Sequence, residues 1–163
     1  VMPPGVHFIK FIATGSGGTG EPYVGGAGAT GIGYLSAGPG TVFAITPALP
    51  PVQANGQEGN STIIATASGG SSVTLVTAQG GKKLETAEAE FTDNPHVLNG
   101  ISVPGSKGQD GFANTGRGVS TRGGSSYWGS SPAPGGGAGE TGNQGDVSWG
   151  TFPGPGIVVL EYN

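Results

Sequence analysis

The sequence predicts an all-β domain: a β-sandwich of jelly-roll type with long glycine-rich loops. Short runs rich in valine, isoleucine and threonine alternate with glycine and proline turn signals along the chain. Only Lys82–Phe91 (KKLETAEAEF) has strong helix propensity, and its weak apolar face favours a short helix or, equally, a charged loop. A length of 163 residues suits one core, so we expect a single domain over residues 1–163.

The two ends of the chain each predict a strand. GVHFIKFIATG (Gly5–Gly15) is apolar on both faces, and such strands are usually covered on both sides. One face carries Val6, Phe8 and Ile12, and the other face carries Ile9, Phe11 and Ala13. GIVVLEYN (Gly156–Asn163) is the matching run at the other end. We expect both strands to share one sheet, which would hold the middle of the chain between fixed ends.

Four shorter strands are expected between these ends, as two pairs that each surround a turn. Tyr34–Ser36 and Val42–Thr46 flank an Ala-Gly-Pro-Gly sequence. Thr62–Ala67 and Val73–Ala78 flank a Gly-Gly step. Glycine and proline at these places are turn signals, and the β-branched residues around them favour extended backbone.

Glycine is the most unusual feature of the composition, at 36 of 163 residues with 13 prolines. Such a share often signals disorder, but disordered chains are usually rich in charge, and only 10% of this chain is charged. The glycine-rich stretch Gly100–Gly156 also carries two tryptophans, a tyrosine and two phenylalanines, which bury much area when packed. We therefore expect a compact, ordered region in place of a flexible linker.

Composition excludes several classes of protein. There is no cysteine, so disulfides and thiolate metal sites are impossible. The net charge is −4, and the six Lys and Arg residues are scattered, which is a poor footprint for nucleic acid. No apolar run approaches the length of about 20 residues that membrane insertion requires. The opening VMPPGVHFIKF resembles no signal peptide and does not begin with methionine, so we expect a fragment of a longer chain.

No cofactor or metal ion is expected. Gly15, Gly17 and Gly20 match the dinucleotide fingerprint G-x-G-x-x-G, which requires a following helix. The sequence that follows, EPYVGGAGATGIG, cannot form one, and the G-K-[ST] of a P-loop is absent. The spacings of histidine and EF-hand metal sites are also absent, and loop acids beside glycine would hold calcium only weakly.

The residues also argue against an enzyme. The two histidines, His7 and His96, are far apart, and no G-x-S-x-G nucleophile elbow occurs. A structural role is expected for His7 within its strand. Three loop acids could pair as the carboxylates of a small glycan-cleaving enzyme, although their spacing does not demand it. They are Asp110, Glu140 and Asp146.

Several motifs together resemble a known family. The chain opens with P-x-G-V-x-x-I and a glycine patch, continues with GYLSAGPGTVFAIT and SSVTLVTAQGGK, and closes with PGPGIVVLEYN. This order resembles the glycine-rich domain at the C-terminal ends of bacteriophage tail fibres and related receptor-binding proteins. Two segments depart from the pattern, PALPPVQANGQEGN and KLETAEAEFTDNPHVLN, and they are candidate specificity loops.

The resemblance implies a function and partners. It implies a homotrimeric tip, joined to the rest of a tail fibre at the distal end of an extracellular virion. The partner would be a host bacterial surface receptor, either a lipopolysaccharide or capsular glycan or an outer-membrane protein. In the related tip adhesins of T-even-like phages, glycine-rich segments pack as polyglycine II helices, and Pro134–Gly145 is a candidate for such packing. The alternative is a structural coat or matrix protein without a specific receptor.

Candidate receptor contacts follow from the aromatic and hydrogen-bonding residues in glycine-rich surroundings. They are Phe112, Asn114, Arg117, Arg122, Tyr127, Trp128, Trp149, Phe152 and, in a loop after proline, His96. Adjacent residues on an extended segment point to opposite sides, so one of Tyr127 and Trp128 is expected inside and the other outside. Whether this pair and Trp149 are scaffold or contact residues stays open at the level of sequence.

Overall fold

A computed structural model gives the fold of most of the chain. It describes residues 4–18, 25–36, 41–49, 61–66, 72–82, 86–93, 95–107, 119–120, 123–137, 140–143, 146–149 and 153–162. Every regular element in these ranges is a strand, and all pairings between strands are antiparallel, which confirms the all-β class. The strands are β1 Phe8–Thr14, β2 Thr30–Ser36, β3 Val42–Thr46, β4 Ser61–Thr66, β5 Ser72–Ala78, β6 Ala89–Phe91, β7 Val97–Val103, β8 Val119–Ser120, β9 Glu140–Asn143, β10 Asp146–Trp149 and β11 Ile157–Glu161.

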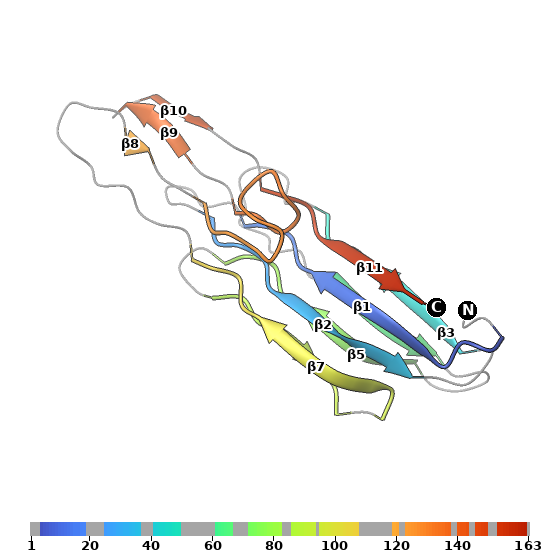
Figure 1. The fold of residues 1–163 in the computed structure, drawn as a ribbon. Coiled ribbons are helices and arrows are strands. Elements are labelled where there is room, and N and C mark those ends of the chain that lie inside the picture. Colours follow the sequence, from blue (N-terminus) through green and yellow to red (C-terminus); the bar gives the residue numbers. More distant parts are fainter. Residues whose placement is uncertain are drawn as a thin grey trace.

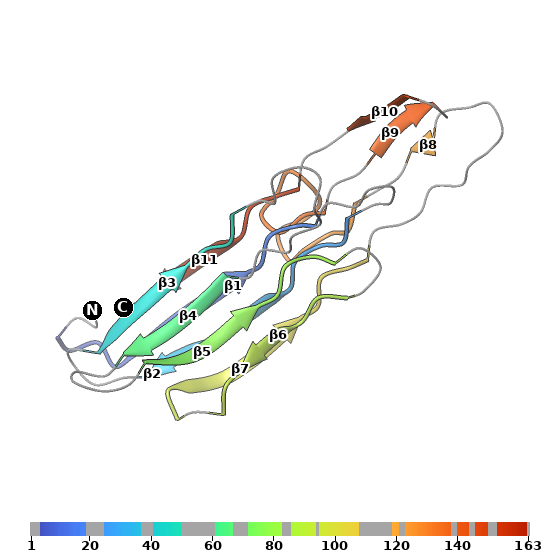
Figure 2. The same ribbon diagram turned by 180° about the vertical axis from the view of Figure 1, so that it is seen from behind.

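Two four-stranded sheets lie face to face as a sandwich (Figures 1 and 2). The terminal sheet has the strand order β11-β1-β2-β7, and the meander sheet has the order β3-β4-β5-β6. Lys10 pairs with Glu161 and Thr14 with Ile157, so the two end strands are neighbours, as expected from sequence. The jelly-roll detail is not confirmed. The meander sheet keeps its strands in chain order, whereas a jelly roll is built from two Greek keys.

The core lies between the two sheets. Phe11, Leu35, Ile63, Leu75 and Val76 have no exposed surface, and burying each such side chain contributes about 1.5–3 kcal/mol. Ile9 and the smaller residues Ala13 and Ala78 complete the cluster. The face of β1 that carries the odd-numbered residues is therefore the core face, as alternation along a strand requires.

The middle strands are present, but their pairings differ from expectation for one pair. β4 and β5 form the expected antiparallel pair, with Thr66 opposite Ser72. β2 and β3 are both strands, yet β2 belongs to the terminal sheet and β3 to the meander sheet. The chain crosses from one layer to the other between them, so the Ala-Gly-Pro-Gly sequence does not join two neighbouring strands.

The window with helix propensity contains a strand. Residues 83–85 lie outside the described part, and the remainder is extended and ends in β6. Ala87 bridges to Gly105, and both Ala87 and Ala89 are buried. Burial of these small side chains against neighbouring backbone overrides the helix propensity of the segment.

A bundle of extended glycine-rich segments continues the sandwich beyond the end of β1, and we call it the glycine bundle. Its segments are 15–18, 25–29, 79–82, 105–106, 124–126, 133–137 and 153–156, which are joined by backbone hydrogen bonds. At its centre, the amides of Gly26, Ala27 and Gly28 donate to Lys82, Ser106 and Gly135, each on a different neighbouring segment. The next amide, that of Ala29, donates to the carbonyl of Gln79, which lies on the same neighbouring segment as Lys82.

This repeat of three distinguishes the bundle from a sheet. A strand bonds to at most two neighbours, whereas a helix of three residues per turn presents its amides in three directions, as in polyproline II geometry. The expected run Pro134–Gly145 enters the bundle only in part. Gly135 and Gly137 bond to Pro155 and Gly124, while the run later forms β9.

Glycine is required in the bundle because the backbones touch. A Cβ at Gly17 would lie under 3.0 Å from the Gly136 carbonyl oxygen, and a Cβ at Gly26 would meet the carbonyl of Lys82 in the same way. Neither glycine has a positive φ, so close approach is the reason for its presence. β8, β9 and β10 form a small third sheet at the end of the molecule opposite the chain ends (Figure 1).

Candidate functional site

Five of the candidate contact residues lie outside the described part of the chain. They are Phe112, Asn114, Arg117, Arg122 and Phe152. Trp149 is the last residue of β10 and pairs with Glu140, and only its backbone is described. Their roles as receptor contacts stay predictions.

His96 lies in the turn before β7, close to the end of β2. Its Nδ1 is 2.7 Å from the Ser36 carbonyl oxygen, which can only accept, so Nδ1 is the donor in this contact. The Ser36 amide in turn donates to the His96 carbonyl at 2.8 Å. The half-buried His96 thus joins the end of β2 to the start of β7. This is a structural role, in addition to the receptor contact predicted from sequence.

Tyr127 and Trp128 form the tip of a tight turn whose ends, Ser126 and Gly129, exchange both backbone hydrogen bonds. The Trp128 Nε1–H donates to Thr14 Oγ1 at 2.9 Å, and Thr14 Oγ1 also contacts Thr30 Oγ1 at 2.8 Å. Trp128 therefore fastens this turn to the outer face of β1. The two rings meet edge to face, with centroids 5.2 Å apart.

Neither ring of this pair is buried. Tyr127 is 51% exposed and Trp128 is 36% exposed, so the expectation of one buried and one exposed side chain is wrong. Strict alternation applies to extended backbone, and these residues occupy a turn. Trp128 is anchored through its indole nitrogen, while much of its surface faces solvent.

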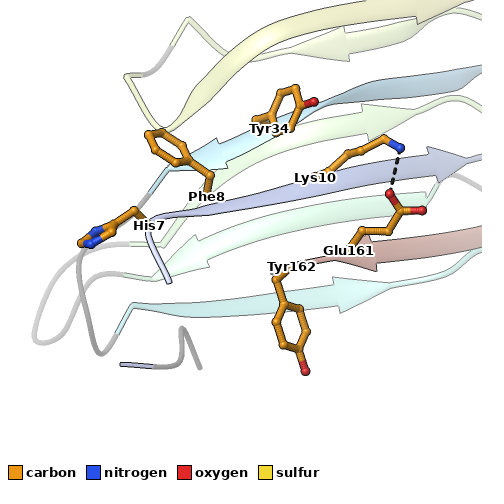
Figure 3. A pocket seen from close by; sticks show the side chains of 6 residues that line it. All are labelled: His7, Phe8, Lys10, Tyr34, Glu161 and Tyr162. Atoms are coloured by element: carbon orange, nitrogen blue, oxygen red, sulfur yellow. Dashed lines mark hydrogen bonds and ion pairs between the residues drawn. The ribbon is translucent and has the colours of Figure 1, made fainter. Parts of the chain in front are cut away.

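A concave site lies on the outer face of the terminal sheet, and we call it the sheet groove (Figure 3). It encloses about 420 Å³ and is lined by His7, Phe8, Lys10, Tyr34, Glu161 and Tyr162. Alternation along β1 creates this lining, because Ile9 and Phe11 enter the core and their neighbours must point outward. Lys10 is opposite both Tyr34 on β2 and Glu161 on β11, so one row crosses three strands.

An ion pair forms part of the lining of the sheet groove. Lys10 Nζ lies 2.8 Å from Glu161 Oε2, with Tyr34 and Phe8 on one side of the pair and Tyr162 on the other (Figure 3). The hydrogen bond to Glu161, followed by its charge, raises the pKa of Lys10 above 10.5. The ammonium is therefore present at neutral pH and is lost only as the pH rises above that range.

The aromatic turn lies on the same face of β1 as the sheet groove. Tyr127 is close enough to Lys10 to contribute to the raised pKa of the ammonium. Thr14, which holds Trp128, shares the outward face of β1 with Phe8 and Lys10. Four aromatic side chains thus lie on the outer face of one sheet, and Tyr162 lies beside them after the end of β11. Each is more than a third exposed: Phe8, Tyr34, Tyr127, Trp128 and Tyr162.

The sequence predicted only part of this surface. A strand that is apolar on both faces was expected to be covered on both, and Ile12 is indeed only 7% exposed. Phe8, on the same face, is 55% exposed, so cover is missing at the groove end of the strand. The pattern of β1 signalled an apolar outer face. The sequence of β1 did not predict which residues of β2 and β11 lie opposite it, because cross-strand register arises from tertiary structure.

The structure places the other sequence-predicted sites only in part. The Gly15 and Gly17 amides donate to the carbonyls of Ala29 and Gly154, so they are occupied. Glu140 pairs with Trp149 and Asp146 with Asn143, so the two acids start opposite strands of one hairpin, three residues apart in register. Asp110 lies outside the described part. Within the described ranges, no cluster of metal-ligating side chains occurs.

Comparisons with protein-family models, with curated proteins and with solved structures gave no match to this chain. Among the residues that the structure describes, no helix is long and apolar enough to cross a membrane.

Proposed function

We propose that this protein is the receptor-binding tip of a bacteriophage tail fibre, which attaches the virion to a host bacterial surface molecule without catalysis. The observation that carries the proposal is the set of five exposed aromatic side chains on and beside the outer face of the terminal sheet. Exposed apolar clusters of this kind mark sites of interaction. Tyrosine and tryptophan suit such sites because they lose little conformational entropy when they bind.

The architecture supports attachment in a second way. The beginning of β1 and the end of β11 lie at the same end of an elongated molecule, and β8, β9 and β10 lie at the other (Figure 1). A domain joined to a fibre at this end of the molecule would project its far end and its flanks outward. The glycine bundle between the two ends joins its segments by backbone hydrogen bonds, which suits a stiff projecting element.

The test is binding of the purified, fluorescently labelled chain to a panel of bacterial strains, measured by flow cytometry. We expect binding to a restricted set of strains, and we expect the unlabelled chain to protect those strains from phages that adsorb to them. Receptor-deficient mutants of a bound strain should lose the signal. Absence of binding to all strains would contradict the proposal.

The structural coat or matrix alternative is supported by the glycine bundle, which requires no receptor to explain it. The two proposals differ in the same experiment. A coat or matrix protein would bind no cell specifically, and receptor-deficient mutants would behave like their parents.

A further inference from the structure

We propose that the sheet groove is a binding site for a neutral oligosaccharide. The inference rests on the proposed function, of which it names the ligand chemistry, and it places the contact on residues other than the nine predicted from sequence. The groove combines three aromatic side chains with one ion pair in a concavity of about 420 Å³. Small-ligand sites have volumes in this range and combine apolar walls with a few polar groups.

The lining matches the two surfaces of a pyranose ring. The face of such a ring carries C–H groups with partial positive charge, which pack against the negative face of an aromatic ring. Phe8, Tyr34 and Tyr162 supply three exposed rings, between 44% and 63% exposed. The rim of a pyranose carries hydroxyl groups, which both donate and accept hydrogen bonds. The Lys10 ammonium donates and the Glu161 carboxylate accepts, 2.8 Å apart.

The charge of the groove favours a neutral sugar over an anionic one. Lys10 and Glu161 compensate one another, so the site presents no excess of positive charge. The whole chain carries a net charge of −4, which would repel a polyanion at long range. An acidic polysaccharide would need to displace Glu161 from Lys10 before the Lys10 ammonium could form an ion pair with it.

The same ion pair argues against a second copy of this chain as the occupant. The cores of protein interfaces are depleted of charged residues. The free-energy cost of removing two charges from water can exceed the Coulombic energy that they gain from one another. Here the pair lies between the aromatic rings, with the Lys10 and Glu161 side chains 38% and 56% exposed. A bound sugar would instead offer its own hydroxyl groups as hydrogen-bond partners to the Lys10 ammonium and the Glu161 carboxylate. The ion pair would therefore remain hydrogen-bonded when the ligand binds.

The experiment measures binding of the full chain to neutral oligosaccharides of glucose, galactose, mannose and rhamnose, with a heparin oligosaccharide as the anionic comparison. Saturation-transfer NMR identifies binders, and titration calorimetry gives their affinity. We expect at least one neutral sugar to bind and the heparin oligosaccharide not to bind. Loss of one stacking ring, in Tyr34→Ala or Tyr162→Ala, should weaken binding about tenfold.

Ile101→Ala is the matched control. Ile101 is exposed on the outer face of the same sheet, opposite Ile32, and does not line the groove, so its loss should leave sugar affinity unchanged. Circular dichroism and thermal unfolding of each variant establish that it is folded. Tyr162 follows the last strand, so Tyr162→Ala keeps the test valid if Tyr34→Ala fails to fold.

Four results would overturn the proposal: no binding of any neutral sugar, preferred binding of heparin, affinity unaffected by both tyrosine variants, or a dimer that dissociates in those variants. The last result would assign the groove to a second copy. Cell binding separates the two proposals. Cells bound equally well by Tyr162→Ala would leave the attachment function intact and remove the groove from it, whereas sugar binding without cell binding would do the reverse.

Discussion

Trp128 links the aromatic turn to the sandwich through one hydrogen bond from its indole nitrogen to Thr14. Trp128→Phe keeps an aromatic ring and removes that donor, so we expect a loss of about 1 kcal/mol of stability in denaturant unfolding. Tyr127→Phe is the matched control, because the 51% exposed Tyr127 should tolerate loss of its hydroxyl within about 0.5 kcal/mol. Equal effects of both changes would show that the indole hydrogen bond contributes nothing.

The Lys10–Glu161 pair gives a prediction for alkaline pH. The pKa of Lys10 is raised in the folded state, so its contribution to stability is complete below 10.5 and is lost as the pH rises above the folded value. The stability difference between the wild type and Lys10→Met should therefore be constant at neutral pH and shrink above pH 10.5. A difference that changes at neutral pH would contradict the assignment. Denaturant unfolding at several pH values measures it.

At the scale of residues, the sequence singled out aromatic side chains as candidate contacts, but it did not indicate which side chains lie next to one another. Tyr127 and Trp128 were predicted, and the structure attaches their turn to β1 through the hydrogen bond from Trp128 to Thr14. Tyr34 and Tyr162 were not predicted, since nothing in the local sequence reveals that β2 is the second neighbour of β1 or which residues of β2 and β11 lie opposite Lys10. Those neighbours are fixed by pairing over long separations in the chain.

At the scale of elements, the glycine bundle depends on backbone contact. Gly17→Ala places a methyl group against the Gly136 carbonyl, where backbone rather than a flexible side chain must move. We expect a loss above about 3 kcal/mol, at the upper end of overpacking effects. Gly5→Ala is the comparison, because Gly5 has open space around it and a φ of 82°. Its cost should be only the left-handed strain, about 1–2 kcal/mol.

Thermal and denaturant unfolding measure both variants. A Gly17→Ala protein as stable as Gly5→Ala would show that the bundle segments can separate without cost. Such a result would contradict the close packing described for the bundle.

Hydrogen exchange offers a second measurement on the bundle. The amides of Gly15, Gly26 and Gly28 are buried and each donates to a backbone carbonyl of another segment. We therefore expect them to exchange about as slowly as amides of β1, since exchange reports the free energy of local opening. Exchange at the rate of an unfolded chain would mean that the bundle opens independently of the sandwich.

At the scale of the whole molecule, a homotrimer remains our proposal for the assembled state. Three copies would combine weak individual sites into strong attachment when their geometry allows simultaneous contact. Size-exclusion chromatography with light scattering should give three times the chain mass of 15.8 kDa. A stable monomer at all concentrations would contradict the trimer and leave the binding sites of the single chain unaffected.

The sequence by itself determined the all-β class and the strands at both ends, because apolar alternation and β-branched residues act locally. The matching apolar runs at the two ends also predicted their meeting in one sheet, which the pairing of β1 with β11 confirms. The sequence also indicated an ordered glycine-rich region, but for another reason than the structure shows: aromatic burial was expected, whereas Tyr127 and Trp128 are exposed and backbone hydrogen bonds join the described segments. Only the tertiary structure decided that β2 and β3 lie in different layers, that Lys82–Phe91 forms no helix in its described part, and that Tyr34, Lys10 and Glu161 form one row. Each of these depends on contacts between distant segments, whose free energy exceeds local preference.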